Sequence, residues 1–221
     1  MKYDLIIVAA TKDDSLRRMT QEAIDSCVND GAEVNVILVE TFRRSEKELA
    51  AYKNVNKFVI YAEEFNYNRC LNRGLAFRTG DVQIMANNDI IFEPGWSKIG
   101  QIMIDNGYLS ASALSSHTLQ RVFPRDDVAY EGYDISRYVS GWCLFAQSKV
   151  FEMIGKLDES FSFWYSDNIY VNQLKKAGIK NYLICNCTVN HYISKTLSKQ
   201  DRKTILKYTD AERKNIHKLN R

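Results

Sequence analysis

One stretch of the sequence places a carboxylate at the end of a strand-like apolar run. Residues 81–95 read DVQIMANNDIIFEPG, in which the apolar run 82–86 ends in Asn87, Asn88 and Asp89. A buried strand of this kind delivers one acidic group to the edge of a sheet, where ligands bind in open α/β proteins. A carboxylate there suits a hard divalent cation that bridges phosphate oxygens, although Asn-Asn-Asp is also an ordinary turn sequence. Asp89 is therefore a candidate metal ligand.

Two further polar residues occupy positions where chemistry can occur, and each also has a structural explanation. Asp167 begins a helical pattern after an aromatic-rich segment, so it is a candidate general base or a helix N-cap. His191 follows the apolar run 182–189 and is a candidate metal ligand through a neutral imidazole nitrogen, or a hydrogen-bonded structural residue. The residues alone leave both pairs of interpretations open.

The elements that must position these side chains alternate between strand and helix patterns. Apolar runs at 3–10 and 34–39 flank a helical pattern over 16–28, which predicts a βαβ unit in a parallel sheet. Residues 115–138 have no clear period and predict a long loop or lid of the kind that carries function. Further strands are expected at residues 57–61, 108–114, 139–147 and 182–189, and further helices at residues 43–52, 68–77, 96–106, 149–154 and 167–177.

Composition is that of a soluble globular domain. The chain has 221 residues, of which 45% are hydrophobic, enough for one compact core. No apolar run approaches the length of a membrane span, and the first residues turn acidic too quickly for a signal peptide, so no transmembrane segment is expected. The five cysteines form no CxxC pair, which favours free thiols in a reducing cytoplasm over a zinc site.

The net charge of +3 conceals an uneven distribution. Residues 192–221 hold nine basic side chains against three acidic ones, so this segment carries +6 and the remainder carries −3. We expect a domain over residues 1–191, with 192–221 as a basic helical C-terminal extension of the same domain. Such a segment contacts phosphates or anionic lipid, or is a solvated helix face.

Four patches occur in an order that is similar to one known family. Residues 65–74 (FNYNRCLNRG) precede the strand that ends in Asn87-Asn88-Asp89, residues 140–159 (SGWCLFAQSKVFEMIGKLDE) follow, and residues 161–178 (FSFWYSDNIYVNQLKKAG) lead through aromatic residues into an acidic position. Together they resemble the GT-A fold of nucleotide-sugar-dependent glycosyltransferases, in particular the inverting family 2. Two departures stand out, because Asn87 replaces the first Asp of the family's DxD motif and Ser166 replaces the first residue of its Glu-Asp pair.

The resemblance implies a fold, a metal and a set of site residues. The implied fold is a single GT-A domain with a Rossmann-like, mostly parallel sheet flanked by helices. Asp89 and His191 are implied to bind Mn²⁺ or Mg²⁺, and Asp167 to act as the general base. The implied donor-binding residues are Thr11, Glu40, Asn72, Arg73, Asn88 and Trp142.

The implied reaction is transfer of a sugar from a UDP- or GDP-sugar to a hydroxyl group, with inversion. The acceptor is expected to be a saccharide, a protein or a nucleic acid. Three alternatives stay open: a glycosyltransferase of modified DNA bases, a catalytically silent sugar-nucleotide-binding module, and a nucleotidyltransferase. Nucleotidyltransferases usually carry a glycine-rich basic loop after the first strand, and the segment AATKDDS lacks one.

Overall fold

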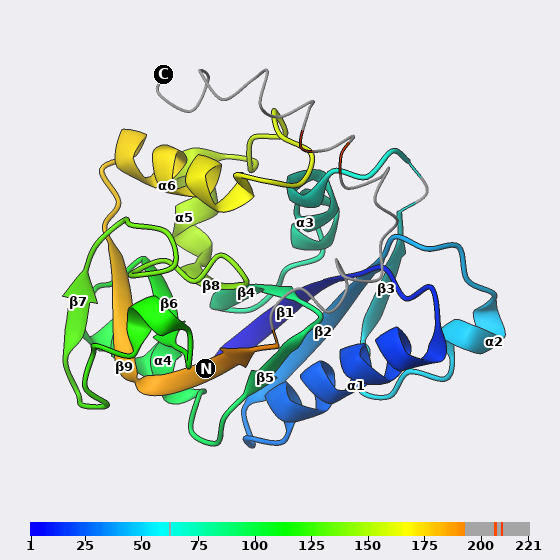
Figure 1. The fold of residues 1–221 in the computed structure, drawn as a ribbon, viewed down its shortest axis with the longest axis horizontal. Helices are drawn as coiled ribbons and strands as arrows, with labels where there is room; N and C mark the ends of the chain where they lie inside the picture. Colours follow the sequence, from blue (N-terminus) through cyan, green and yellow to red (C-terminus); the bar gives the residue numbers. More distant parts are fainter. Residues whose placement is uncertain (62, 193–205, 207–208, 210–221) are drawn as a thin grey trace.

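The protein consists of one sheet between two layers of helices (Figure 1). The computed structural model describes residues 1–61 and 63–192, together with Leu206 and Thr209. Nearly all of the predicted basic extension lies outside the described residues, so its helical form stays a prediction. In the part of the chain that is described, no helix combines the length and the apolar character needed to cross a membrane.

The N-terminal half forms the parallel part of the sheet, in the order β3-β2-β1-β4. Each crossover in this half carries a helix, as the βαβ pattern in the sequence predicts. The strands are β1 (Lys2–Ala9), β2 (Glu33–Glu40), β3 (Lys57–Ile60) and β4 (Val82–Asn87), and the helices are α1 (Asp14–Val28), α2 (Glu46–Leu49) and α3 (Tyr67–Leu75).

Beyond β4 the sheet is mixed. β8 (Cys143–Gln147) runs antiparallel to β4, and β6 (Ser110–Leu114) antiparallel to β8. β9 (Asn181–His191) runs parallel to β6 and pairs with two short antiparallel strands, β5 (Ile90–Phe92) and β7 (Ala129–Glu131). The remaining helices are α4 (Lys98–Asp105), a 3₁₀ turn η1 (Thr118–Gln120), α5 (Ser148–Ile154) and α6 (Ser166–Lys176).

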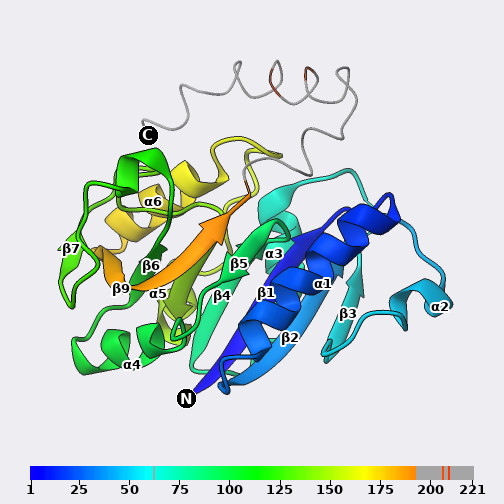
Figure 2. The same cartoon turned by 60° about the horizontal axis from the view of Figure 1, so that its bottom comes forward.

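Hydrophobic cores fill both faces of the sheet. One core packs α1 and α4 against one face around the fully buried Trp96, and the other packs α3, α5 and α6 against the opposite face. Figure 2 shows α1 lying across β1 and β2 on the first of these faces. Burial on both faces explains why β1 is near-continuously apolar, as central parallel strands are.

Two sequence predictions differ from the structure in the C-terminal half of the chain. The segment 115–138 is not wholly a loop, because it contains η1 and the edge strand β7. The predicted strand 139–147 begins only at Cys143, and residues 139–142 lie before the strand as a separate segment. Apolar residues such as Val139 are buried there by tertiary packing, so hydrophobicity alone placed the strand start too early.

The topology gathers many chain segments at one edge of the sheet. β1, β2 and β4 end there because they are parallel, and β6 and β9 end there because they run antiparallel to β8. β8 begins at the same edge, since Cys143 pairs with Ala86 near the end of β4. The segments that follow or precede these strand ends therefore face one another, as expected for a ligand-binding edge.

Helix α3 sits close to the sheet because of a glycine. A Cβ added at Gly74 would lie 2.5 Å from Ile6 Cγ2 and 3.0 Å from Val39 Cγ2, so the helix contacts β1 and β2 through its backbone. The same helix presents Tyr67 at its start, toward the edge of the sheet where β4 ends.

Replacing Gly74 with alanine should therefore destabilise the fold. We expect Gly74→Ala to lower the free energy of unfolding by about 1–3 kcal/mol, because overpacking outweighs the helix propensity gained. The exposed neighbour Arg73→Ala should change it by no more than about 1 kcal/mol, the size of a surface ion pair. Urea denaturation of both variants checks this, and equal stabilities would show that α3 can move away from the sheet at little cost.

Candidate functional site

Asp89 and His191 form the first part of the candidate site. His191 Nε2 lies 3.1 Å from Asp89 Oδ1, and the backbone N–H of Tyr192 donates to the carbonyl of Asp89 at 2.8 Å. The pairing of Ile90 with His191 between β5 and β9 fixes this approach. Asp89 is only 3% exposed. The structure thus brings together the two residues that were predicted to bind a metal.

Trp142 packs directly on this pair. Its ring stacks on the His191 imidazole with centroids 5.2 Å apart and an interplanar angle of 8°, and His117 lies against it at 5.4 Å. Trp142 is 8% exposed, so it presents little ring surface to a sugar. Its Nε1–H is buried without a hydrogen-bond partner among the described residues and remains available to an acceptor oxygen.

Asp167 occupies the first turn of α6 and is not the N-cap. The N-cap position belongs to Tyr165, which has a positive φ of 64° and makes no side-chain capping bond. Asp167 Oδ1 accepts from the backbone N–H of Asn168 at 2.9 Å, and its side chain packs inward against Gly141. A Cβ added at Gly141 would lie 2.8 Å from the Asp167 Cβ, so only glycine leaves room for the carboxylate here.

The environment of Asp167 suits a proton acceptor. Burial raises the pKa of its carboxyl group above the ordinary value, and the bond from the Asn168 N–H opposes this shift only in part. Among the described residues, no cationic side chain forms an ion pair with the Asp167 carboxylate. A carboxylate with a raised pKa is a stronger base than a free aspartate, which is what general-base catalysis needs.

Tyr67 connects the two carboxylates. Its hydroxyl donates to Asn87 Oδ1 at 2.8 Å, and it lines a small pocket together with Gly141 and Asp167. Burial raises the pKa of Tyr67 strongly, and the charges of Asp89 and Asp167 both add to that shift. The Asn87 N–H also donates to the Trp142 carbonyl at 2.9 Å. The segment 141–142 therefore lies between Asp167 on one side and His191 on the other.

The ends of β1 and β2 form a second polar group. Glu40 accepts from the N–H groups of Thr11 and Phe42 at 3.1 and 2.9 Å and from the Thr11 hydroxyl. Glu40 and Thr11 are both fully buried, and burial raises the pKa of the Glu40 carboxyl. The pair that was predicted to contact the nucleobase therefore exists, but it lies beneath the surface in this conformation.

Arg44 lies near enough to this buried pair for its charge to act on Glu40. The charge of Arg44 lowers the pKa of Glu40, and this effect is the smallest of those that act on Glu40. Arg44 Nη1 donates to Glu48 Oε1 at 2.7 Å. The opposite edge of the guanidinium, Nε and Nη2, is buried without a partner. That edge is the planar fork that binds phosphate or carboxylate bidentately.

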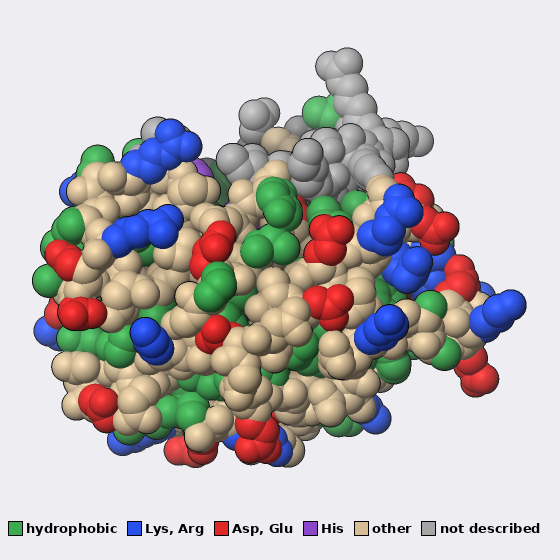
Figure 3. All heavy atoms as spheres, turned by 90° about the horizontal axis from the view of Figure 1, so that it is seen from below, with side chains coloured by type: hydrophobic (Ala, Val, Ile, Leu, Met, Phe, Trp, Pro, Cys, Tyr) green, Lys and Arg blue, Asp and Glu red, His purple; other side chains and the backbone are tan. Residues whose placement is uncertain are grey.

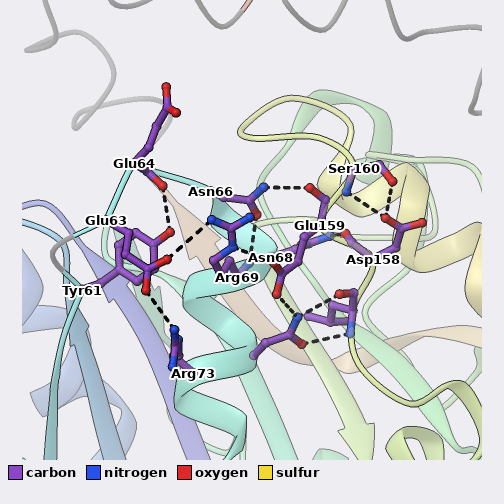
Figure 4. Close-up of polar contacts among 12 residues, drawn as sticks. Tyr61, Glu63, Glu64, Asn66, Asn68, Arg69, Arg73, Asp158, Glu159 and Ser160 are labelled. Atoms are coloured by element: carbon purple, nitrogen blue, oxygen red, sulfur yellow. Dashed lines mark hydrogen bonds and ion pairs between the residues drawn. The ribbon is translucent and has the colours of Figure 1, made fainter.

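Three predicted donor-binding residues have other roles in the structure. Asn88 donates from Nδ2 to Thr20 Oγ1 on α1 at 2.9 Å and is buried there. Asn72 bonds the backbone of Leu157, and Arg73 pairs with Glu63 on the surface at 2.9 Å (Figure 4). These contacts give the side chains of Asn72 and Arg73 partners within the protein, and the predicted donor contacts of both residues stay predictions.

The sequence patterns missed four residues of the site: Arg44, Tyr67, His117 and Gly141. Arg44 comes shortly after Glu40, the last residue of β2, and this is a weak signal that a basic side chain lies near the same edge of the sheet. His117 follows β6 in the same way that His191 ends β9. Gly141 and Tyr67 belong to patches that carry the family resemblance, but the side chains they face are known only from the fold.

A divalent cation fits the Asp89–His191 pair only in part. A carboxylate oxygen and an imidazole nitrogen 3.1 Å apart can share one ion, and Mn²⁺ accepts both ligand types. Among the described residues, no group of three or more His, Cys, Asp or Glu side chains could hold a metal. Two protein ligands leave most coordination positions to water or to a ligand such as a diphosphate.

The five cysteines are all buried free thiols, as the sequence predicted. Cys185 and Cys187 are both buried on β9, with Asn186 exposed between them, which is the alternation of a strand with one buried face.

Comparison with known proteins supports the fold. The structure is similar to the crystal structure of GalNAc-T7 with UDP, GalNAc and Mn²⁺, with a TM-score of 0.66 and 12% sequence identity. The match covers 86% of this chain and 43% of that one, so the chain spans less than half of its structural neighbour. No protein-family model and no curated protein sequence matches. The prediction of a single α/β domain of the GT-A type is therefore confirmed.

The metal-binding role of Asp89 can be tested without knowledge of the reaction. We expect Mn²⁺ with UDP or GDP to raise the melting temperature of the wild type, because a ligand that binds only the folded state stabilises it. Asp89→Asn keeps the shape and removes the charge, so the rise should disappear. The exposed Asp105→Asn serves as the matched control and should keep it. A normal rise with Asp89→Asn, measured by thermal shift, would exclude Asp89 as a ligand.

Proposed function

We propose that this protein is a glycosyltransferase that moves a sugar from a nucleotide diphosphate donor to a hydroxyl group. The observation that carries the proposal is the arrangement around Gly141 and Trp142, which places Asp167 on one side and the Asp89–His191 pair on the other. A proton acceptor and a partial metal site thus share one edge of a GT-A-type sheet.

The buried polar atoms support a donor at this edge. Among the described residues, the buried side-chain nitrogen and oxygen atoms without a partner belong only to Arg44, Tyr52 and Trp142. Buried polar groups are normally satisfied, so unpaired ones mark places where a ligand or water completes the bonding. The Arg44 fork suits the donor's phosphate or base oxygens, and the Trp142 N–H suits a phosphate or sugar oxygen. Arg44 thus joins Trp142 and the other predicted residues as a donor-contact candidate.

The proposed reaction is a direct displacement at the anomeric carbon. The acceptor hydroxyl gives its proton to the Asp167 carboxylate while its oxygen forms the new bond to the anomeric carbon. The bond from that carbon to the diphosphate oxygen breaks, and the diphosphate leaves with the electron pair. A cation held by Asp89 and His191 would neutralise the charge on that leaving group. Attack opposite the departing group inverts the anomeric configuration. The proposal of inversion rests on the resemblance to family 2.

We propose the donor and the acceptor by chemical class and not as individual compounds. A carboxylate at Glu40 next to a bidentate fork at Arg44 is compatible with uracil or guanine, so the proposed donor is a UDP- or GDP-sugar. The proposed acceptor is a saccharide or a protein hydroxyl. Figure 3 shows acidic and basic side chains of the described residues interspersed on one face; a nucleic-acid acceptor stays an alternative, because nearly all of the basic segment 192–221 lies outside the described residues.

Product analysis separates this proposal from its alternatives. A panel of UDP- and GDP-sugars is incubated with Mn²⁺ and simple glycosides, and products are scored by mass and by the anomeric proton coupling. Transfer with inversion supports the full proposal, and transfer with retention overturns only the direct displacement. Binding without turnover indicates the silent module, while release of inorganic pyrophosphate from a sugar phosphate and a nucleoside triphosphate indicates a nucleotidyltransferase.

Asp167→Asn should separate catalysis from folding. Because the buried carboxyl has a raised pKa, its ionised form destabilises the folded state above the unfolded pKa of about 3.9. The amide removes that charge, so at neutral pH the variant should melt at or above the wild-type temperature. It should bind the donor with Mn²⁺ but lose transfer by a factor of about 10² or more. Glu152→Gln on the exposed side of α5 is the control, and transfer near the wild-type rate in Asp167→Asn would refute the assignment.

The acid limb of the pH profile should report the same group. Transfer requires ionised Asp167, so kcat falls as the pH drops through the raised pKa of this carboxyl. We expect the limb at a pH above about 3.9, the ordinary aspartate value. A limb at or below that value, measured where the protein stays folded, would show that a different group accepts the proton.

A further inference from the structure

Side chains from the first turns of α3 hold the backbone of a distant segment, residues 157–162 (Figure 4). Three asparagines donate to three successive carbonyl groups: Asn72 to Leu157 at 2.8 Å, Asn68 to Asp158 at 2.7 Å, and Asn66 to Glu159 at 2.9 Å. The Leu157 N–H returns a bond to Asn72 Oδ1 at 2.9 Å, and the Tyr67 N–H donates to the Ser162 carbonyl at 2.7 Å.

An ion pair reinforces these amide contacts. Arg69 Nε donates to Glu159 Oε2 at 2.6 Å, and the other carboxylate oxygen of Glu159 accepts from Asn72 Nδ2 at 3.0 Å. The pair lowers the pKa of the Glu159 carboxyl despite its partial burial, and it raises that of Arg69. Both side chains remain about one third exposed, and ion pairs at such exposure contribute little to stability. The ion pair therefore matters mainly because it fixes the position of Glu159 relative to α3.

The held segment leads directly to Asp167. Residues 157–162 are followed by the short aromatic turn that ends at Tyr165, and α6 begins at Ser166. Gln173 on α6 bonds the same region from the other side, with Nε2 to the Lys156 carbonyl at 2.8 Å and Oε1 to the Asp158 N–H at 3.1 Å. The segment thus ties α3 to the helix that carries the proposed base.

The same turn of α3 also reaches the metal side of the site. The Tyr67 hydroxyl donates to Asn87, two residues before Asp89, and Tyr67 lies between the charges of Asp89 and Asp167. Helix α3 is itself fixed on the sheet by the close approach at Gly74. One rigid element therefore contacts both halves of the site.

We propose that Asn72, Arg69 and Glu159 are positioning residues, which fix Asp167 relative to Asp89 by holding residues 157–162 against α3. The proposal rests on the proposed function for the role of Asp167. It also gives the asparagines of the FNYNRCLNRG patch a task other than donor binding. Small displacements of a reacting group are costly, since a shift of about 1 Å can reduce the rate by a factor of about 10².

Asn72→Leu is the sharpest test because it removes the amide contacts without changing any charge. We expect kcat to fall by a factor of about 10 to 10², while the Kd for UDP or GDP with Mn²⁺ stays within about twofold, because Asp89 and His191 are untouched. The matched control is Asn106→Leu, the same substitution at an exposed position that ends α4, and it should leave both values unchanged.

A second readout does not depend on activity. The ¹³C signal of the Asp167 carboxyl, assigned with Asp167→Asn, is titrated in the wild type and in Asn72→Leu. Loosening the segment exposes the carboxylate to water, so its midpoint should move down toward the ordinary aspartate value. Tyr67 is the titratable side chain that faces Asp167 from α3, and its much higher pKa keeps it neutral over this range.

A lower melting temperature with unchanged kcat and an unchanged Asp167 midpoint would overturn the proposal, because it would show that the contacts only stabilise the fold. If Asn72→Leu does not fold, Glu159→Gln carries the same kinetic measurements, since it removes the ion pair and keeps the side-chain shape. If the wild type transfers no sugar, the proposed function fails, whereas the carboxyl titration still decides whether α3 controls the environment of Asp167.

Discussion

The contact between the Asp89 carboxylate and the His191 imidazole is the interaction on which the candidate site depends. It joins residues 102 positions apart in the chain, and it closes the edge of the sheet where β4, β5 and β9 meet. A carboxylate that is 3% exposed needs polar partners, and the imidazole supplies one. Trp142 stacks on the imidazole, and Gly141 next to it makes room for Asp167. The other residues of the candidate site are thus connected, directly or through a neighbour, to the buried Asp89 carboxylate.

The surroundings of the two aspartates differ in a way that matches the different tasks of the proposed function. Asp89 lies beside an imidazole in a position that can hold a cation, whereas Asp167 lies against a glycine with a single backbone N–H on its carboxylate. Burial raises the pKa of Asp167, which suits a proton acceptor. This separation of roles by environment is a general way for two carboxyl groups to serve as electrostatic partner and base in one site. Asn87 stands where the family that the sequence resembles has an acid, and its side-chain Oδ1 accepts a hydrogen bond from the Tyr67 hydroxyl.

Sequence patterns predicted the βαβ half of the fold and the strand ends that carry Asp89 and His191. These were predictable because strand hydrophobicity and strand ends follow from local residue order. The burial of Glu40 near Arg44 and the bonds of Asn72 to Leu157 were not predictable, since they depend on segments that meet only in the folded chain. The same limit explains the late start of β8 and the edge strand β7, where tertiary packing decides the structure. The local pattern at Ser166-Asp167 fitted a helix cap, but the cap position went to Tyr165.

The most direct test of the central claim is the position of Mn²⁺ in crystals grown with UDP or GDP, located by anomalous scattering. The account predicts one manganese peak within bonding distance of Asp89 and His191, about 2.2 Å, with diphosphate oxygens completing its coordination. It also predicts an Asp167 carboxylate on the open side of the donor, where an acceptor hydroxyl can approach. A nucleotide bound at this edge with its manganese away from both residues, or bound at another part of the molecule, would contradict the account.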